Sequence, residues 1–248
     1  MKASVHFFEN SVESKKRLRK RITESSTNFS LLKVEPITEN QRKVFEAFRS
    51  NKNLMLHGVA GTGKTFISLY LALELALLGK KDRPVTIIRS VVPTRDIGFL
   101  PGTLEEKIAV YEQPYHSLCS ELFNFKNAYS ELKKRGFAEF STTSFLRGMT
   151  FHNATIVVDE CQNLNFSELS TIITRCGEGC RIIFCGDFRQ TDLNNRERLG
   201  LKHFCNIIRD MEEFDSIDFT ENDIVRSQLV KSFIISQERY KTTHNILL

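Results

Sequence analysis

The segment from Gly58 to Thr65 carries the strongest chemical signal in the sequence. It reads "GVAGTGKT" and satisfies G-x-x-x-x-G-K-[ST], a pattern whose glycines let backbone N–H groups wrap around phosphates. In such a loop Lys64 reaches the β- and γ-phosphates, and the Thr65 hydroxyl faces Mg²⁺. An apolar run precedes the segment and a helical pattern follows it, as this loop requires. The predicted nucleotide-binding residues are Gly58, Val59, Ala60, Gly61, Thr62, Gly63, Lys64 and Thr65.

Two carboxylates end the apolar run of residues 154–159. Asp159 closes that run and Glu160 follows it. Adjacent carboxylates at a strand tip repel one another, so we expect a cation or a catalytic role to offset the cost. In P-loop proteins such an Asp holds Mg²⁺, and such a Glu can polarise the attacking water. The pair favours hydrolysis of ATP over phosphoryl transfer, because small-molecule kinases need no water-activating Glu.

Gln190 and Gln41 are candidate polar contacts to the nucleotide. Gln190 follows the run 181–187, and an amide at that strand end can hydrogen-bond both the γ-phosphate and the attacking water. Gln41 lies upstream of the loop, and its amide can pair with one adenine edge, which would select ATP over GTP. Each residue also has a structural alternative. The Gln190 segment fits a turn, and Gln41, three residues after Thr38, fits a helix cap.

The elements that would position these residues alternate along the chain from about residue 36. Short apolar runs predict strands at 53–56, 85–89, 154–159, 181–187 and 216–219. Periodic stretches predict helices after Pro36, after Gly63, and at about 103–135, 166–175, 196–211 and 224–239. The alternation predicts an α/β fold in which helices cover both faces of a parallel sheet.

The chain divides into a short extension and one domain. Residues 1–33 are polar and basic, and the segment 15–21, "KKRLRKR", is basic at six of seven positions. This extension fits a partly flexible arm, and it also fits a contact to the phosphates of RNA or DNA. Residues 34–248 contain every motif above, and we predict a single P-loop domain there.

Composition argues against several classes of protein. With 41% hydrophobic and 26% charged residues, the chain has no window near the roughly 18 apolar residues of a membrane span. The first residues lack the apolar core of a signal peptide, which predicts a cytoplasmic location. The six cysteines fit that compartment, and Cys176, Cys180 and Cys185 match no common zinc spacing, so we expect free thiols.

Residues 90–107, "SVVPTRDIGFLPGTLEEK", directly follow a predicted strand and hold two of the five prolines. The start of this segment therefore belongs at the carboxyl edge of the sheet, where ligands bind in α/β folds. The prolines stiffen the segment around Arg95. We interpret it as part of a substrate channel or a subunit contact, with a passive connector as the alternative.

The order of the motifs, a Gln, the phosphate loop, D-E-x-Q and G-D-x-x-Q, resembles the RecA-like core of superfamily 1 helicases. The segments "PITENQRKVFEAF", "IGFLPGTLEEK", "SFLRGMTFHNATIVVDECQN", "ITRCGEGCRIIFCGD" and "DIVRSQLVKSFI" sharpen the likeness to the PhoH family of ATPases, over about residues 34–240. Many members of that family are short and phage-encoded, which would mean the host cytoplasm. The resemblance implies a RecA-like P-loop fold, ATP and Mg²⁺ as cofactors, hydrolysis of ATP and an association with RNA, sometimes as a helicase.

Carried over by position, the resemblance assigns roles to residues already singled out. The catalytic positions are Lys64, Glu160 and Gln190, the metal positions are Thr65 and Asp159, and arginines of the family pattern fall at Arg147, Arg175 and Arg226. The chain departs from the pattern at Arg189, where the family has a small or hydroxyl residue, and at residues 88–90, where the family has T-R-P.

An arginine should complete the ATP site. Superfamily 1 helicases take it from a second RecA-like core, for which 248 residues leave no room. We expect it from a neighbouring subunit or from an unusual position in the same chain, and preference runs from Arg226 to Arg175 to Arg147, with a surface salt bridge as each one's alternative. Because head-to-tail contacts that close form rings, we predict a homo-oligomer, with a hexameric ring favoured.

The sequence thus predicts an ATPase that binds, and moves along or remodels, single-stranded RNA or DNA. An alternative of a different class is a slow nucleotide-dependent switch that binds a protein partner. A P-loop kinase is disfavoured by Glu160 and Gln190. Aromatic residues that could stack on bases, among them Tyr111 and Tyr115, cannot be told from core residues by their spacing, and core is the default.

Overall fold

A computed structural model of the chain describes residues 29–78, 83–90, 104–146, 148–188, 193 and 195–244. The basic segment 15–21 and most of the segment 90–107 lie outside these ranges. So do Arg95, Arg147 and Gln190, whose roles stay predictions.

The α-helices are α2 (Glu39–Arg49), α3 (Lys64–Leu77), α4 (Leu104–Phe123), α5 (Ala128–Lys134), α6 (Phe166–Thr174), α7 (Asn195–Asp210) and α8 (Gln228–His244). The strands are β1 (Asn53–Gly58), β2 (Val85–Arg89), β3 (Ala138–Thr142), β4 (Thr155–Asp159), β5 (Arg181–Gly186) and β6 (Phe214–Phe219). Short 3₁₀ turns are η1 (Thr143–Phe145), η2 (Cys161–Asn163) and η3 (Glu221–Asp223).

These strands form one sheet in the order β3-β2-β4-β5-β1-β6, and each described pairing is parallel. The prediction of a parallel sheet is therefore confirmed. Strands β4, β5 and β1 are neighbours in its centre, so their carboxyl ends meet at one edge. That edge carries the phosphate loop after β1, the carboxylate pair after β4 and Asp187 after β5.

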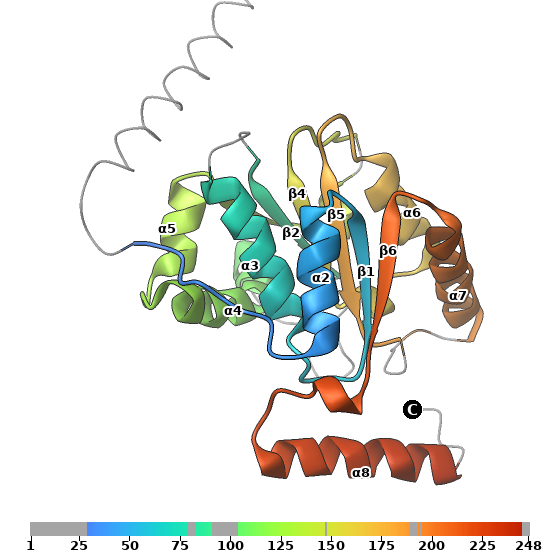
Figure 1. Cartoon of the computed structure of the whole chain (residues 1–248). Helices are drawn as coiled ribbons and strands as arrows, with labels where there is room; N and C mark the ends of the chain where they lie inside the picture. Colours follow the sequence, from blue (N-terminus) through green and yellow to red (C-terminus); the bar gives the residue numbers. More distant parts are fainter. Residues whose placement is uncertain are drawn as a thin grey trace, which may run out of the picture.

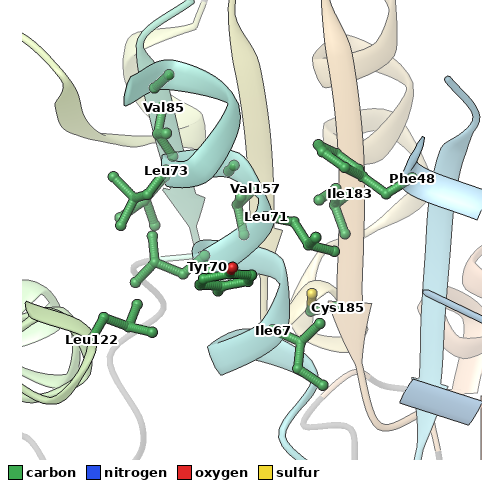
Figure 2. Packing of buried hydrophobic residues seen from close by; sticks show 14 of the residues in the cluster. Phe48, Ile67, Tyr70, Leu71, Leu73, Val85, Leu122, Val157, Ile183 and Cys185 are labelled. Atoms are coloured by element: carbon green, nitrogen blue, oxygen red, sulfur yellow. The ribbon is translucent and has the colours of Figure 1, made fainter. Parts of the chain in front are cut away.

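Helices pack on both faces of the sheet, and each face has its own apolar core (Figure 1). On one face α3 lies against the sheet, where Leu71 packs among Val157 of β4 and Ile183 of β5 (Figure 2). This helix is apolar on nearly all sides because α2, α4 and the sheet surround it. The other face is covered by α6 and α7, with Phe184 and Phe204 in edge-to-face contact. The helical layers fix the position of the central strands.

Three elements differ from the prediction. Strand β3 was not predicted, because it is an edge strand whose Glu139 is exposed and whose sequence lacks an apolar run. The helix expected over 103–135 is two helices, since Asn124 adopts a left-handed φ of 46° and ends α4. The helix expected from residue 224 begins at Gln228, because residues 224–227 run beside the phosphate loop.

Residues 29–33, the described part of the predicted extension, contact the domain. The Leu32 N–H donates to the Leu122 carbonyl at 2.8 Å. The Phe29 ring stacks on Phe123 with centroids 4.6 Å apart. The domain's contacts thus begin a few residues before the predicted boundary at residue 34.

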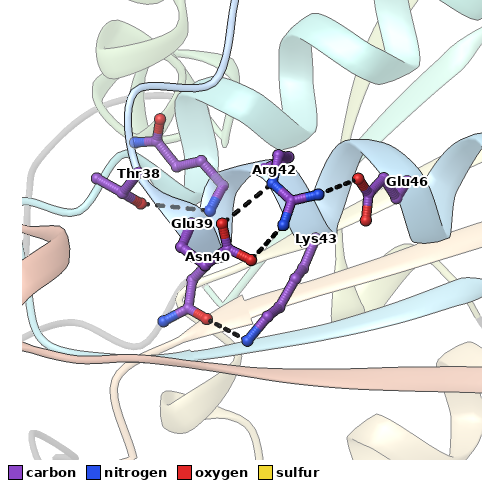
Figure 3. A network of polar contacts seen from close by, with 7 residues as sticks. Thr38, Glu39, Asn40, Arg42, Lys43 and Glu46 are labelled. Carbon is purple, nitrogen blue, oxygen red and sulfur yellow. Dashed lines mark hydrogen bonds and ion pairs between the residues drawn. The ribbon is translucent and has the colours of Figure 1, made fainter.

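The start of α2 is fixed by a cap and by local ion pairs (Figure 3). The Thr38 hydroxyl accepts the Gln41 N–H at 3.3 Å, as the predicted cap requires. Arg42 pairs with Glu39 and Glu46 on the exposed side, which contributes little because solvent screens such pairs. The opposite side turns Gln41 into the protein, toward the phosphate loop.

Candidate nucleotide-binding site

The phosphate loop joins β1 to α3 in a backbone conformation that requires glycine. Gly58 has a φ of 125°, and a Cβ atom there would lie 2.0 Å from the Phe219 carbonyl oxygen of β6. Gly63 caps α3 with a φ of 83°. Helix α3 therefore begins with its free N–H groups beside the loop, which favours an anion.

Lys64 is held inside this loop. Its ammonium group donates to the carbonyl oxygens of Gly58, at 2.8 Å, and Val59, at 2.9 Å. Burial lowers the pKa of Lys64, and the nearby Asp187 carboxylate offsets part of that shift. The side chain therefore already lies within the pocket, 9% exposed, where the pattern expects the phosphates.

Asp159 at the end of β4 contacts the loop directly. Its Oδ1 accepts the Thr65 hydroxyl at 2.7 Å, and its Oδ2 accepts the Tyr115 hydroxyl at 2.9 Å. Burial raises the pKa of Asp159, the neighbouring Glu160 raises it further, and the two hydroxyl donors oppose both effects. A cation at this carboxylate would relieve the cost of burying its charge.

Glu160 follows in a left-handed conformation with a φ of 52°, which is unusual for a residue other than glycine. The Gln162 amide donates to its Oε2 at 2.5 Å. The side-chain Oε1 of Gln162 in turn accepts the Asp187 backbone N–H at 3.1 Å. The tips of β4 and β5 are thus joined through one buried side chain, 4% exposed.

Gln162 is a site residue that sequence reasoning missed. It lines the same pocket as Lys64 and Asp159 and orients Glu160. The available signal was an amide two residues after a carboxylate pair, at the fourth position of D-E-x-Q. The motif includes this amide, but the spacing alone does not indicate its role.

Gln41 is 3% exposed and bonds to the protein on both sides of its amide. Its Oε1 accepts the Ile37 N–H at 2.7 Å, and its Nε2 donates to the Thr62 carbonyl at 3.1 Å. The side chain therefore ties α2 to the phosphate loop. Its predicted adenine contact stays a prediction, since one N–H and one lone pair of the amide are not used by these two bonds.

Arg226 lies beside the phosphate loop of its own chain. A Cβ atom added to Gly61 would lie 3.0 Å from Arg226 Cγ and 3.5 Å from Ile234 Cδ1 of α8. The Val225 N–H donates to the Gly61 carbonyl at 3.0 Å, which anchors this segment. Arg226 takes part in none of the ion pairs found between described residues, and its predicted role as an arginine finger stays a prediction.

Arg175, the second arginine candidate, lies at the opposite edge of the sheet. It caps the end of α6, and its carbonyl accepts the Phe151 N–H at 2.8 Å, just before β4 begins. The amino ends of β4 and β5 are there, whereas the phosphate loop is at their carboxyl ends. Within one chain Arg175 does not join the site, and its predicted role would require a neighbouring copy.

The residues present fit a magnesium nucleotide. The Thr65 hydroxyl and the Asp159 carboxylate are hard oxygen ligands in contact with each other, and Mg²⁺ is commonly held by one or two such groups plus phosphate oxygens. The loop backbone, the α3 N-terminus and Lys64 supply the positive potential that phosphates need. In the described residues, no group of three or more His, Cys, Asp or Glu gathers as a separate metal site.

Comparison with known proteins shows the family of this chain. A family model described as "PhoH-like protein" matches residues 33–237. The chain belongs to the PhoH family. The PhoH-like protein of Synechocystis sp. is 32% identical over 206 residues, which is 83% of this chain and 62% of the relative. Protein PhoH of Escherichia coli K12 is 34% identical over 193 residues, 77% of this chain and 54% of that protein.

PhoH relatives such as these two are longer than this chain, which spans 62% and 54% of their lengths. Among solved structures, the large terminase from a thermophilic bacteriophage aligns with a TM-score of 0.50 at 14% identity, covering 84% of this chain and 50% of the terminase. At that identity the likeness shows the fold alone. Family and fold together support a P-loop NTPase core and confirm the predicted RecA-like architecture.

Two other predictions concern the rest of the chain. The six cysteines are free, and Cys185 lies in the core with its Sγ 3.0 Å from the Ser68 hydroxyl. Burial raises the pKa of Cys176 to about 12. Over the part of the chain that the structure describes, no helix has the length and apolarity needed to cross a bilayer.

Proposed function

We propose that this PhoH-family chain binds and hydrolyses ATP with Mg²⁺ at the carboxyl edge of its sheet. The observation that carries the proposal is the convergence of three strand ends in one hydrogen-bonded site. Lys64, Asp159 and Asp187 come from three separate parts of the sequence and line a single pocket. A nucleotide-binding loop alone would not require a buried carboxylate at the Thr65 hydroxyl.

Each residue has a role in the proposed reaction. Lys64 and the α3 N-terminus bind the β- and γ-phosphates, and Thr65 with Asp159 holds Mg²⁺, which neutralises charge developing on the phosphates. Glu160 polarises the attacking water. Gln162 limits the orientations of Glu160 because it bonds to that carboxylate and to the Asp187 backbone. Gln190 keeps its predicted role as a γ-phosphate sensor.

Arg226 is proposed to complete the site in the same chain. It lines the pocket together with Gly61 and Lys64, and the Val225–Gly61 hydrogen bond holds its backbone at the loop. An arginine near the γ-phosphate stabilises charge in the transition state. This position makes a neighbour's arginine unnecessary, so oligomerisation needs a separate argument.

That argument comes from α8. Its apolar side chains Leu229, Phe233 and Tyr240 are 81%, 64% and 58% exposed. Helix α8 lies outside the helical layers that cover the sheet (Figure 1). An apolar helix face beside the site favours contact with a second molecule, and we propose a second copy of this chain, with a closed ring of six as the preferred arrangement.

The proposed substrate is single-stranded RNA or DNA. Support comes from the helicase-like order of the motifs and from the basic segment 15–21. The alternative is a slow nucleotide-dependent switch that binds a protein. The exposed apolar residues of α8 are compatible with that alternative, because such residues fit a protein partner better than a nucleic acid.

The experiment that separates the two is ATP hydrolysis with and without nucleic acid. The native chain is assayed in Mg²⁺ with single-stranded RNA, single-stranded DNA or neither. We expect one polymer to raise the turnover of ATP several-fold, with the effect declining as salt rises because phosphate contacts release counterions. Hydrolysis that neither polymer changes at low salt would contradict the nucleic-acid proposal and support the switch.

A further inference from the structure

Tyr115 of α4 is a core residue by burial, yet its hydroxyl reaches the proposed metal site. The side chain is 1% exposed, and its hydroxyl donates to Asp159 Oδ2 at 2.9 Å. This hydrogen bond links α4 to the end of β4.

The Tyr115 ring is held by packing from two other elements. Its centroid lies 5.8 Å from that of Phe140 on β3 and 6.3 Å from that of Tyr129 on α5. Tyr129 in turn bonds to Glu112 of α4, at 3.1 Å. Because α4 is tied to α5 and the ring is enclosed, the Tyr115 hydroxyl has a fixed position relative to β4.

Asp159 receives one hydroxyl on each of its oxygens. Thr65 donates to Oδ1 from the phosphate loop, and Tyr115 donates to Oδ2 from α4. Two donors fix the plane of the carboxylate, whereas Thr65 alone would leave it free to rotate. Groups that hydrogen-bond a metal ligand in this way set the ligand's orientation and thereby the affinity of the site.

Tyr129 shows what a purely structural tyrosine looks like in the same core. It is as fully buried as Tyr115, but its acceptor Glu112 is already paired with Lys133 at 2.6 Å. Glu112 is not among the residues that line the nucleotide pocket, whereas Asp159 is. The two tyrosines thus differ in the role of their acceptor rather than in burial.

We propose that Tyr115 is a positioning residue for the magnesium nucleotide, acting through Asp159. It orients the Asp159 carboxylate so that one oxygen is presented to the cation together with the Thr65 hydroxyl. The inference rests on the proposed function, since it assigns Asp159 to the metal. It adds a residue from α4, an element outside the phosphate loop and the strand tips.

The test compares Tyr115→Phe with the matched control Tyr129→Phe. Each variant loses one buried hydroxyl and keeps its ring, and thermal unfolding checks that both fold. ADP binding is titrated with Mg²⁺ in steps, and again in EDTA. We expect Y115F to raise by about ten-fold the Mg²⁺ concentration at which the tightening of ADP binding is half-maximal, because a metal ligand loses its hydrogen-bond partner. The affinity for ADP in EDTA should stay unchanged. Y129F should match the native chain in both measurements.

Binding and hydrolysis are measured separately, so failure of the proposed function can be told from failure of the Tyr115 proposal. If the native chain binds ADP with Mg²⁺ but does not hydrolyse ATP, the proposed function fails while the Tyr115 titration still stands. Equal Mg²⁺ dependence of Y115F and Y129F would overturn the role of Tyr115. In an Asp159→Asn background, Y115F should cause no further change in Mg²⁺ dependence, and an additive change would show that Tyr115 does not act through Asp159. If Y115F is less stable than the native chain, the titrations are made below its unfolding midpoint, which the thermal measurement supplies.

Discussion

The strand tips and helix α8 meet at the phosphate loop, and they are built in opposite ways. At the strand tips, polar side chains such as Lys64, Asp159 and Gln162 are buried and bonded to partners in the same chain. On α8, apolar side chains such as Leu229 and Phe233 are exposed. In the central strands β4 and β5 the usual rule holds, since their apolar residues are buried.

This difference links the strand tips to the proposed chemistry and α8 to the proposed assembly. Burying polar groups is costly unless they are paired, and the hydrogen bonds that pair these side chains at the strand tips all come from one chain. Exposed apolar groups cost little in a single chain but favour association. Arg226 lies between the two regions, on the segment that joins η3 to α8. Substituting Arg226 therefore tests whether one chain completes the site without a neighbour.

Arg226→Ala should have the largest effect. We expect ATP turnover to fall on the order of 10³-fold or more, because an arginine at the γ-phosphate carries that weight in related chemistry. The affinity for ADP should hardly change. The control is Arg239→Ala, which removes an exposed arginine of α8 away from the pocket. Turnover reduced equally in both variants would remove Arg226 from the site.

Mixing variants decides whether Arg226 acts within one chain. Arg226→Ala and Lys64→Ala are each expected to be inactive, and they are combined at equal concentration under conditions that allow subunit exchange. If Arg226 served a neighbour, mixed interfaces would restore part of the activity. We expect no restoration, because Arg226 lies at its own chain's loop.

The double substitution Leu229→Ser and Phe233→Ser should affect assembly next most strongly. Burial of one such side chain contributes about 1.5–3 kcal/mol, so losing two should weaken self-association by more than ten-fold. Light scattering with and without an ATP analogue measures the oligomer. Because both residues are exposed, the midpoint of thermal unfolding of the single chain should stay the same. Val110→Ser, at an exposed apolar position of α4, is the control. A native chain that stays a monomer under both conditions would contradict the assembly proposal.

Gln41→Ala should have the smallest of these effects on turnover and a measurable one on stability. The substitution leaves the Ile37 N–H and the Thr62 carbonyl without their described partner, which costs about 1–3 kcal/mol where such groups are buried. Urea unfolding compares it with Gln228→Ala, which alters an exposed glutamine at the start of α8. If Gln41 also contacts adenine, the ratio of ATP to GTP affinity falls in the same variant, and an unchanged ratio would leave it a structural residue.

The sequence predicted the central part of this fold and site well, for physical reasons. Strands β1, β4 and β5 are buried on both faces, so they read as continuous apolar runs whose ends could be located. In a parallel sheet those ends must share one edge, which is enough to bring Lys64 and Asp159 together. Edge strand β3 carries no such signal, because Glu139 and its exposed face interrupt the pattern.

Contacts between residues far apart in the sequence were what the sequence could not predict. Tyr115 reaches Asp159 across 44 residues, and its helical spacing is the same as that of an ordinary core residue. The sequence favours Arg226 among the arginines, but its neighbouring residues do not indicate that it lies beside Gly61 of its own loop. Such contacts depend on how elements pack, which local pattern does not encode.

The most direct test of the central claim is the steady-state hydrolysis of ATP by Glu160→Gln in Mg²⁺. Gln keeps the size of the side chain and removes the charge that polarises water, so turnover should fall on the order of 10²–10⁴-fold while ATP binding persists. The matched control, Glu178→Gln, changes an exposed glutamate at the opposite edge of the sheet and should hydrolyse ATP as the native chain does. If Glu160→Gln turned over ATP at the native rate, the assignment of the catalytic carboxylate, and with it the account of the site, would be wrong.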